Sequence, residues 1–335
     1  AAVHDALLPH CASLKSFART PPGTLDRLAH PKLARWFHSA PLAAWVRSEL
    51  ARGAADLVHV DEMFLHPVVP RGDPTPLVIH HHKLDVEFAL ATGASPYDLS
   101  KLRRLERAAC ARTPHHVLCG APDAQRLAGR ATGLRCHVVP NGVDPEHFRP
   151  TSTPRVAGRL LFLASLDYAP NVEALQWLLD GILPRVRATR PDAHLHVVGA
   201  RPTPAVRSLV AAAGEGAELV GEVEDVRPHL AGASLMVVPL RQGGGSRLKI
   251  VEALAAGCPV VSTAVGAEGL ELVDGEHLCL ADGEAALAQA LLRLLADPAL
   301  AARYARAGRQ RILERNTWSA LGERLQAAWR SAAGV

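Results

Sequence analysis

The stretch RQGGGSRLKIVEALAAGCPVVST, residues 241–263, carries the pattern that decides the fold. Its three glycines, 243–245, separate an apolar run that ends at Leu240 from a segment with helical spacing over 246–257. A second apolar run, 258–263, follows directly and predicts another strand. Strand, helix and strand in immediate succession predict a βαβ unit, and therefore a parallel sheet.

The same alternation continues through both halves of the chain. In the second half, strands are expected at 159–165, 194–200, 217–223, 233–240 and 277–282, and helices at 170–191, 203–214, 284–297 and 298–315. In the first half, strands are expected at 57–63, 76–82, 115–121 and 136–143, and a helix at 95–112. We therefore predict an α/β protein of two Rossmann-like domains with parallel sheets. The joint is expected at 140–158, which holds four prolines and two glycines.

Composition narrows the class of protein. The chain has 335 residues, 48% of them apolar, which is enough for two cores. Its formal net charge of +4 is too small to indicate nucleic-acid binding. Six scattered cysteines lack the spacing of a zinc or redox motif, so we interpret them as small buried side chains in a reducing compartment. The chain begins at Ala1 with a polar segment, and we expect a fragment whose first strand is missing.

The glycine turn has the composition of an anion site. Free N–H groups and the dipole at a helix start attract negative charge, and glycines let the backbone approach a ligand closely. Arg247 and Lys249 in the first helical turn are unfavourable there unless an anion offsets them, and a diphosphate fits. Glu252, about one turn further on, suits the two hydroxyls of a ribose. A mobile loop followed by a solvated helix face fits the same residues.

Ligands of open parallel sheets bind at the carboxyl ends of the strands. The turns 165–171, 198–202, 220–225 and 238–245 should then line one crevice. Each is rich in glycine, proline or polar residues. Any one of them also fits an ordinary connecting turn.

An ordered set of segments resembles the retaining glycosyltransferases of family 4, which have the GT-B fold. The segments are VPNGVD (139–144), the PN helix start after 159–165, VGEVEDVRPHLAGASLMVVPL (220–240), the stretch 243–263 and NTWSAL (316–321). The resemblance implies two domains facing across a cleft. It also implies that residues 1–150 form the acceptor side and that 151–315 bind the sugar nucleotide. We expect 316–335 to cross back to the first domain.

The activity that this resemblance implies is hexosyl transfer from a nucleoside-diphosphate sugar to a glycan, lipid-linked or other hydroxyl acceptor. Neither a cofactor nor a metal is expected. The family typically pairs two glutamates eight positions apart; Glu252 matches the second, but Gly244 stands at the first. The segment 164–174 lacks the arginine and lysine that clamp the diphosphate in many relatives. Arg247 and Lys249 are the expected substitutes and the predicted catalytic cations.

The resemblance also suggests further site residues. The donor-side residues are Gly243, Gly244, Gly245, Ser246, Gly221, Val223 and Leu166. The acceptor or sugar side is expected to include His82, Asp61 and Asn141. Asp61 stands where many relatives carry a histidine. The run 80–82 is three histidines, but alternate strand residues point to opposite faces, so all three cannot easily converge on a metal. A cleft-lining role and an exposed rim remain open for them.

Two other functions fit the same features: a sugar-nucleotide 2-epimerase of this fold and a non-catalytic nucleotide-sugar-binding module. The basic helix 95–112 suggests either a solvated face or peripheral contact with an anionic membrane. No run of about 18 apolar residues is present, so no span is predicted. We expect a bacterial protein of the cytoplasm, with contact at the inner membrane left open.

Overall fold

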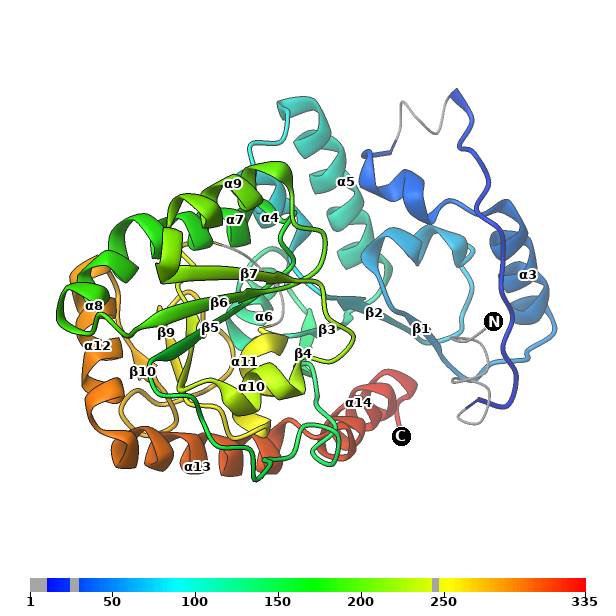
Figure 1. The fold of residues 1–335 in the computed structure, drawn as a ribbon. Coiled ribbons are helices and arrows are strands. Elements are labelled where there is room, and N and C mark those ends of the chain that lie inside the picture. Colours follow the sequence, from blue (N-terminus) through cyan, green and yellow to red (C-terminus); the bar gives the residue numbers. More distant parts are fainter. Residues whose placement is uncertain (1–10, 25–29, 243–246) are drawn as a thin grey trace.

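The structure is a computed structural model and describes residues 11–24, 30–242 and 247–335 (Figure 1). It contains a four-stranded sheet in the first half of the chain and a six-stranded sheet in the second. All strand pairs in both sheets are parallel. The predicted class, two parallel α/β domains, is therefore confirmed.

The N-terminal sheet has the order β1-β2-β3-β4. Its strands are β1 (Val58–Val60), β2 (Leu77–His81), β3 (His115–Leu118) and β4 (Arg135–Val138). The helices around it are η2 (Leu33–Phe37), α3 (Ala40–Ala51), η3 (Met63–Val68), α4 (Asp85–Ala91), α5 (Pro96–Arg112) and α6 (Ala121–Ala128). Strands β2 and β3 are almost wholly buried, as expected for strands covered on both faces.

The C-terminal sheet has the order β10-β9-β8-β5-β6-β7. Its strands are β5 (Arg159–Leu163), β6 (His194–Val198), β7 (Ala217–Gly221), β8 (Leu235–Val238), β9 (Val260–Ser262) and β10 (Cys279–Leu280). The chain adds β6 and β7 on one side of β5 and then returns to add β8 on the other. The order therefore reverses between β5 and β8, and a crevice at such a reversal is where doubly wound sheets bind ligands.

Helices cover both faces of this sheet (Figure 1). They are α7 (Ala169–Trp177), the π-helical turn η4 (Leu178–Ile182), α8 (Leu183–Thr189), α9 (Pro204–Ala212), η5 (Gly214–Gly216), α10 (Arg227–Gly232), α11 (Leu248–Ala255), α12 (Glu284–Ala296) and α13 (Pro298–Arg315). The single helix predicted over 170–191 is thus interrupted by η4. Pro184 explains the interruption, because its ring removes an N–H donor and crowds the carbonyl four residues before it.

Three carboxyl-end turns of this sheet pack tightly through Gly199. The N–H of Gly199 donates to the carbonyl of Gly221, at 2.7 Å, and so joins the ends of β6 and β7. A Cβ on Gly199 would lie 1.6 Å from the carbonyl oxygen of Ala164, and the residue has φ +156°. Only glycine fits at this position.

The last helix, α14 (Trp318–Ala333), leaves the C-terminal domain and covers one face of the N-terminal sheet (Figure 1, red). Its buried residues Leu321 and Ala328 pack against Val78, Val117 and Val139. The crossing is fixed at its start, where the N–H of Val143 donates to the carbonyl of Asn316 at 2.8 Å. At its far end, Trp329 Nε1 donates to His59 Nδ1 at 2.9 Å.

In the described ranges, no single helix is long and apolar enough to cross a membrane. The sharply bent pair α12 and α13, at 103°, meets that criterion only when the two are taken together.

We predict that Leu321→Ala lowers the free energy of unfolding by about 2–5 kcal/mol, because it opens a cavity between α14 and the sheet. Leu321 is 2% exposed. Denaturant titration followed by tryptophan fluorescence measures the change. Val335→Ala, at a residue 88% exposed, is the control and should leave stability unchanged. Equal stability of the two variants would show that α14 contributes nothing to the N-terminal core.

Candidate active site between the two domains

A cavity of about 320 Å³ lies between the two domains. Its N-terminal wall comes from α4, the β3–α6 turn and the turn after β4. Its C-terminal wall includes Gln242, Arg247, Val251 and Glu268. The domains touch closely at its edge, where the α-carbon of Gly269 lies 3.5 Å from the position of a Cβ on Gly120. Phe88 also stacks against Tyr168 across the domains, with ring centroids 6.1 Å apart.

Arg247 is the predicted cation that reaches this cavity. It caps the start of α11, is 5% exposed, and lines the C-terminal wall. Its Nη2 donates to the carbonyl of Val265 at 2.9 Å. Burial lowers the pKa of the guanidinium. An arginine nevertheless keeps its charge at physiological pH, so the wall presents a fixed cation.

Glu268 lies between arginines of the two domains. Its Oε1 accepts from Arg126 Nη2, on α6, at 3.1 Å, and its Oε2 lies 3.9 Å from Arg247 Nη2. Sequence reasoning did not select Glu268 or Arg126. Nothing in the local sequence places these two residues together, since they are 142 positions apart.

Lys249, on α11, contacts the start of α7 at the strand-order reversal. Its Nζ donates to Asn171 Oδ1 at 3.1 Å, and Asn171 Nδ2 donates to the carbonyl of Ser165 at 3.0 Å. Burial, and then the nearby charge of Arg247, lowers the pKa of Lys249 to about 8. Lys249 is not among the described residues that line the cavity. It lies next to the segment 165–171, and because it is buried there, its charge is poorly hydrated.

Glu252 lies one turn further along α11. Burial raises the pKa of its carboxyl to about 7. Within the described ranges its carboxylate has no hydrogen-bond or ion-pair partner, and it does not line the cavity. A half-buried carboxyl of this kind can accept hydrogen bonds from hydroxyl groups of a ligand.

The other residues predicted to bind the donor differ in where they lie. Gly243, Gly244, Gly245 and Ser246 lie outside the described residues. Gly221 ends β7 with φ +81° and open space at its α-carbon, and Val223 packs partly against the core. Leu166 is wholly buried, so its side chain belongs to the core and only its backbone lies at the turn.

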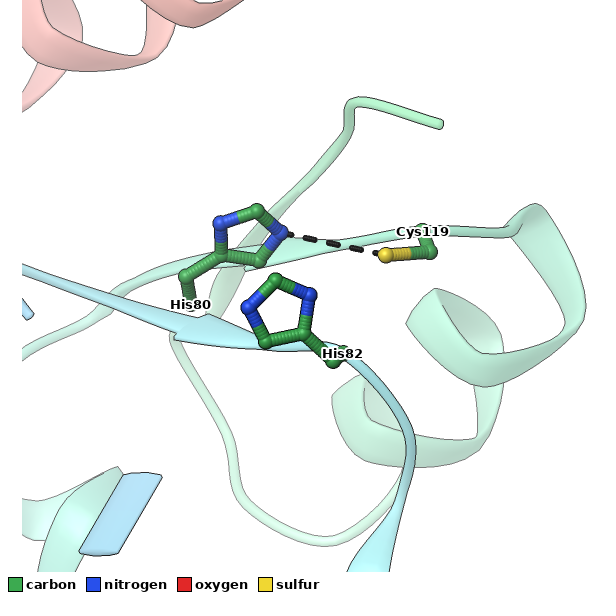
Figure 2. Close-up of side chains that lie close together, drawn as sticks. All are labelled: His80, His82 and Cys119. Carbon is green, nitrogen blue, oxygen red and sulfur yellow. Dashed lines mark hydrogen bonds between the residues drawn. The ribbon is translucent and has the colours of Figure 1, made fainter. Parts of the chain in front are cut away.

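On the N-terminal side, the carboxyl ends of β1, β2 and β3 bring together Asp61, His80, His82 and Cys119. Asp61 Oδ1 lies 2.9 Å from His80 Nδ1 and 3.2 Å from His82 Nε2. Cys119 Sγ lies 3.8 Å from His80 Nε2 (Figure 2). His81 points to the opposite face, where its Nε2 lies 3.0 Å from His116 Nδ1. The predicted alternation of the three histidines is therefore confirmed.

The groups in this cluster stabilise one another's charged forms. The nearby imidazoles of His59, His80 and His82 hold the pKa of Asp61 far below its ordinary value. The interaction with Asp61, and then the proximity of Cys119, raises the pKa of His82 to about 10. Burial works against a thiolate at Cys119, but the nearby imidazoles of His80 and His82 outweigh it and lower the pKa of that thiol.

Asn141 joins the cluster to the cavity. It lines the cavity, its Oδ1 lies 3.8 Å from Cys119 Sγ, and its carbonyl accepts from Asn316 Nδ2 at 3.4 Å. Sequence reasoning selected His82, Asp61 and Asn141 but missed His80 and Cys119. The available signal was that all of these residues end neighbouring parallel strands, whose carboxyl ends share one sheet edge.

Two protein-family profiles match adjacent parts of the chain. The profile described as Glycosyltransferase Family 4 matches residues 13–147, and the profile described as Glycosyl transferases group 1 matches residues 157–297. The boundary between the matches falls in the segment that connects the two sheets.

Several curated relatives are named as mannosyltransferases of bacteria. Phosphatidyl-myo-inositol mannosyltransferase of Mycobacterium leprae (strain TN) is 32% identical over 220 residues, which are 63% of this chain and 57% of that protein. The protein of the same name from Mycobacterium tuberculosis (strain ATCC 25618 / H37Rv) is 29% identical over 305 residues, 86% of this chain and 77% of that protein. The chain thus spans only part of the length of each.

Solved structures share the fold at low identity. Sucrose-phosphate synthase from Thermosynechococcus elongatus superposes with a TM-score of 0.75 at 21% identity, covering 96% of this chain and 84% of that one. Anabaena Alr3699/HepE in complex with UDP and glucose gives a TM-score of 0.73 at 17% identity, covering 99% and 89%. The two profiles and this two-domain architecture identify the chain as a GT-B glycosyltransferase.

We predict that Glu252→Gln stabilises the ligand-free protein at pH 8 by about 2–3 kcal/mol and leaves it unchanged near pH 4.5. The folded pKa lies above the ordinary 4.5, so the stability that Glu252 contributes is complete below pH 4.5 and is lost as pH rises through about 7. Chemical denaturation at several pH values measures the difference.

The matched control for this prediction is Glu323→Gln, at an exposed glutamate on α14. It should show no such pH dependence. A difference between wild type and Glu252→Gln that stays constant from pH 4.5 to 8 would contradict the burial of an ionisable carboxyl at this position.

Proposed function

We propose that this chain moves a hexose from a nucleoside-diphosphate sugar to a hydroxyl acceptor, with retention at the anomeric carbon. The observation that carries the proposal is Arg247. It is a buried cation at the start of α11, at the carboxyl edge of the sheet where strand order reverses, and it lines the interdomain cavity. A diphosphate is the ligand chemistry that suits a fixed guanidinium beside a helix start.

The charge that develops in the reaction explains the choice of residues. As the glycosidic bond breaks, negative charge grows on the leaving diphosphate, and preorganised positive charge there lowers the barrier. Arg247 supplies a permanent charge. Lys249 lies in an environment that disfavours its charge, and a bound diphosphate would stabilise that charge. In this proposal Arg247 and Lys249 replace the first glutamate and the usual diphosphate-binding cations of family 4. The chain then belongs to a branch of that family with the sequence GGG-S/T-R-L-K.

For the donor, we propose a guanosine or uridine diphosphate sugar, with GDP-mannose tested first. Two curated relatives are named as GDP-mannose-dependent mannosyltransferases, which supports that order. In this proposal Glu252 accepts hydrogen bonds from the ribose hydroxyls, and the base lies near Gly221 and Val223. The glycine turn 243–246 contributes backbone N–H groups to the diphosphate.

For the acceptor, we propose a lipid-linked hydroxyl presented at an anionic membrane surface. Relatives named for phosphatidyl-myo-inositol support this class. On α5, Arg103, Arg104 and Arg107 are exposed on the side away from the buried Leu102 and Leu105. Exposed Leu90 and Tyr97 lie on α4 and α5, which pack together. A basic stripe with apolar side chains nearby suits an anionic bilayer.

We predict that Arg247→Ala and Lys249→Ala each lower turnover by about a hundredfold or more, because each removes charge at the leaving phosphate. Transfer of labelled mannose from GDP-mannose to phosphatidylinositol-containing micelles measures the rate. Arg241→Ala is the matched control, since Arg241 pairs with Glu173 outside the cavity lining and its loss should change turnover little. Near-normal turnover in Arg247→Ala would refute the assignment.

The same assay separates the alternatives. A 2-epimerase would consume the sugar nucleotide without any acceptor present. A binding module would retain GDP or UDP in a thermal-shift titration and show neither transfer nor hydrolysis. Transfer that depends on the acceptor contradicts both alternatives.

We predict that replacing Arg103, Arg104 and Arg107 together by glutamine weakens binding to vesicles of phosphatidylinositol and phosphatidylserine by about a hundredfold. Each basic side chain near such a surface contributes about 1 kcal/mol. Vesicle co-sedimentation at low salt measures this. Arg303 and Arg306, exposed on α13, provide the matched control, and their replacement should leave sedimentation unchanged. Equal losses in both variants would argue against a specific membrane face on α5.

A further inference from the structure

We propose that His80, His82 and Cys119 bind a zinc ion at the carboxyl ends of β2 and β3, with Asp61 orienting His80. The inference goes beyond sugar transfer and holds whether or not the chain transfers a sugar. It rests on the convergence of two imidazoles and a thiol from two neighbouring strands (Figure 2).

The spacing of the ligand atoms fits a tetrahedral ion. One ligand atom from each of the three residues lies within 4.8 Å of the others. His80 Nε2 and Cys119 Sγ are 3.8 Å apart. Bonds of about 2.3 Å to sulfur and about 2.0–2.1 Å to nitrogen at a tetrahedral angle place those two atoms about 3.6 Å apart. For this pair of ligand atoms, a shift of a few tenths of an ångström is enough to seat the ion.

Asp61 completes an arrangement typical of zinc sites. Its Oδ1 lies 2.9 Å from His80 Nδ1, which is the nitrogen facing away from Cys119. A carboxylate that accepts from one ring nitrogen fixes the tautomer and leaves the other nitrogen free to coordinate. His80 therefore has one nitrogen held by Asp61 and the other directed at the thiol.

The chemistry of the donor set favours zinc. Imidazole and thiolate ligands select zinc and other borderline or soft ions, whereas Mg²⁺ and Ca²⁺ require oxygen ligands. Cys119 is buried, while the side chains of His82 and Asp61 are 39% and 66% exposed. The ion thus has a route of entry, and water can reach a fourth position.

A second histidine cluster provides an internal comparison. His194 and His196 on β6 lie near Glu218, and these three residues also satisfy the spacing of a metal site. This second group contains no sulfur. A signal from metal–thiolate bonding therefore distinguishes the first cluster from this second one.

The test uses the full chain without a polyhistidine tag, stripped with a chelator and then loaded with zinc or cobalt. We expect about one tightly bound ion per chain by elemental analysis, and a thiolate-to-cobalt charge-transfer band in the near ultraviolet. Cys119→Ser and His82→Ala should each weaken binding by at least tenfold, and Cys119→Ser should abolish the band. Asp61→Asn should weaken binding about 10–100-fold.

The double variant His194→Ala/His196→Ala should keep both the band and the tight site. Circular dichroism checks that each variant is folded, and half-exposed His82 is the position whose loss should disturb the fold least. Absence of a charge-transfer band in the folded wild type would overturn the proposal. So would a band that persists in Cys119→Ser, or metal content that falls only in the double variant; the cluster is then a hydrogen-bonded network only.

Discussion

The hydrogen bond from Lys249 to Asn171 connects α11 with the start of α7, and the rest of the site depends on this connection. Strand order reverses between β5 and β8. The segments that follow these two strands therefore run in opposite directions and leave a crevice between them. Lys249, on α11, contacts Asn171 at the start of α7 across this crevice. This bond holds a poorly hydrated ammonium group at the place where a ligand's negative charge is expected. The charged forms of Lys249 and of the half-buried Glu252 are both poorly hydrated. Without a ligand, these two residues therefore make this edge less stable than neutral residues of similar shape would.

The N-terminal domain faces this edge with a different chemistry. Its carboxyl-end residues are histidines, a thiol and a carboxylate that share protons and hydrogen bonds, and no fixed cation takes part in the cluster as described. The C-terminal wall of the cavity thus presents the buried cation of Arg247, and the N-terminal wall presents Cys119, through which the histidine cluster reaches the cavity. The two walls are joined through Glu268, which contacts arginines from both domains.

Much of the fold could be predicted from the sequence, because buried parallel strands and amphipathic helices leave strong periodic signals. Arg247 was also predictable, since a cation directly after a glycine turn is locally unusual. The break at Leu178–Ile182 was missed because Pro184 is tolerated by widening one turn rather than by ending the helix. Cys119 and Glu268 were missed because their partners are distant in sequence, and only the strand register of β2 and β3 brings His80 beside Cys119. Leu166 was selected from the resemblance and its position at a turn, and burial of its side chain is decided by packing that no local pattern reveals.

The position of α14 has a consequence for how the protein is made. Val78, Val117 and Val139 are synthesised early, yet the face of the sheet that they form is covered by residues 318–333. During translation this apolar face stays uncovered while nearly two hundred further residues emerge from the ribosome. The N-terminal domain therefore cannot complete its core as an independent early unit, in contrast to the usual order for multidomain chains. A nascent chain stalled before α14 would expose a valine-rich surface to chaperones, even with the second domain already folded.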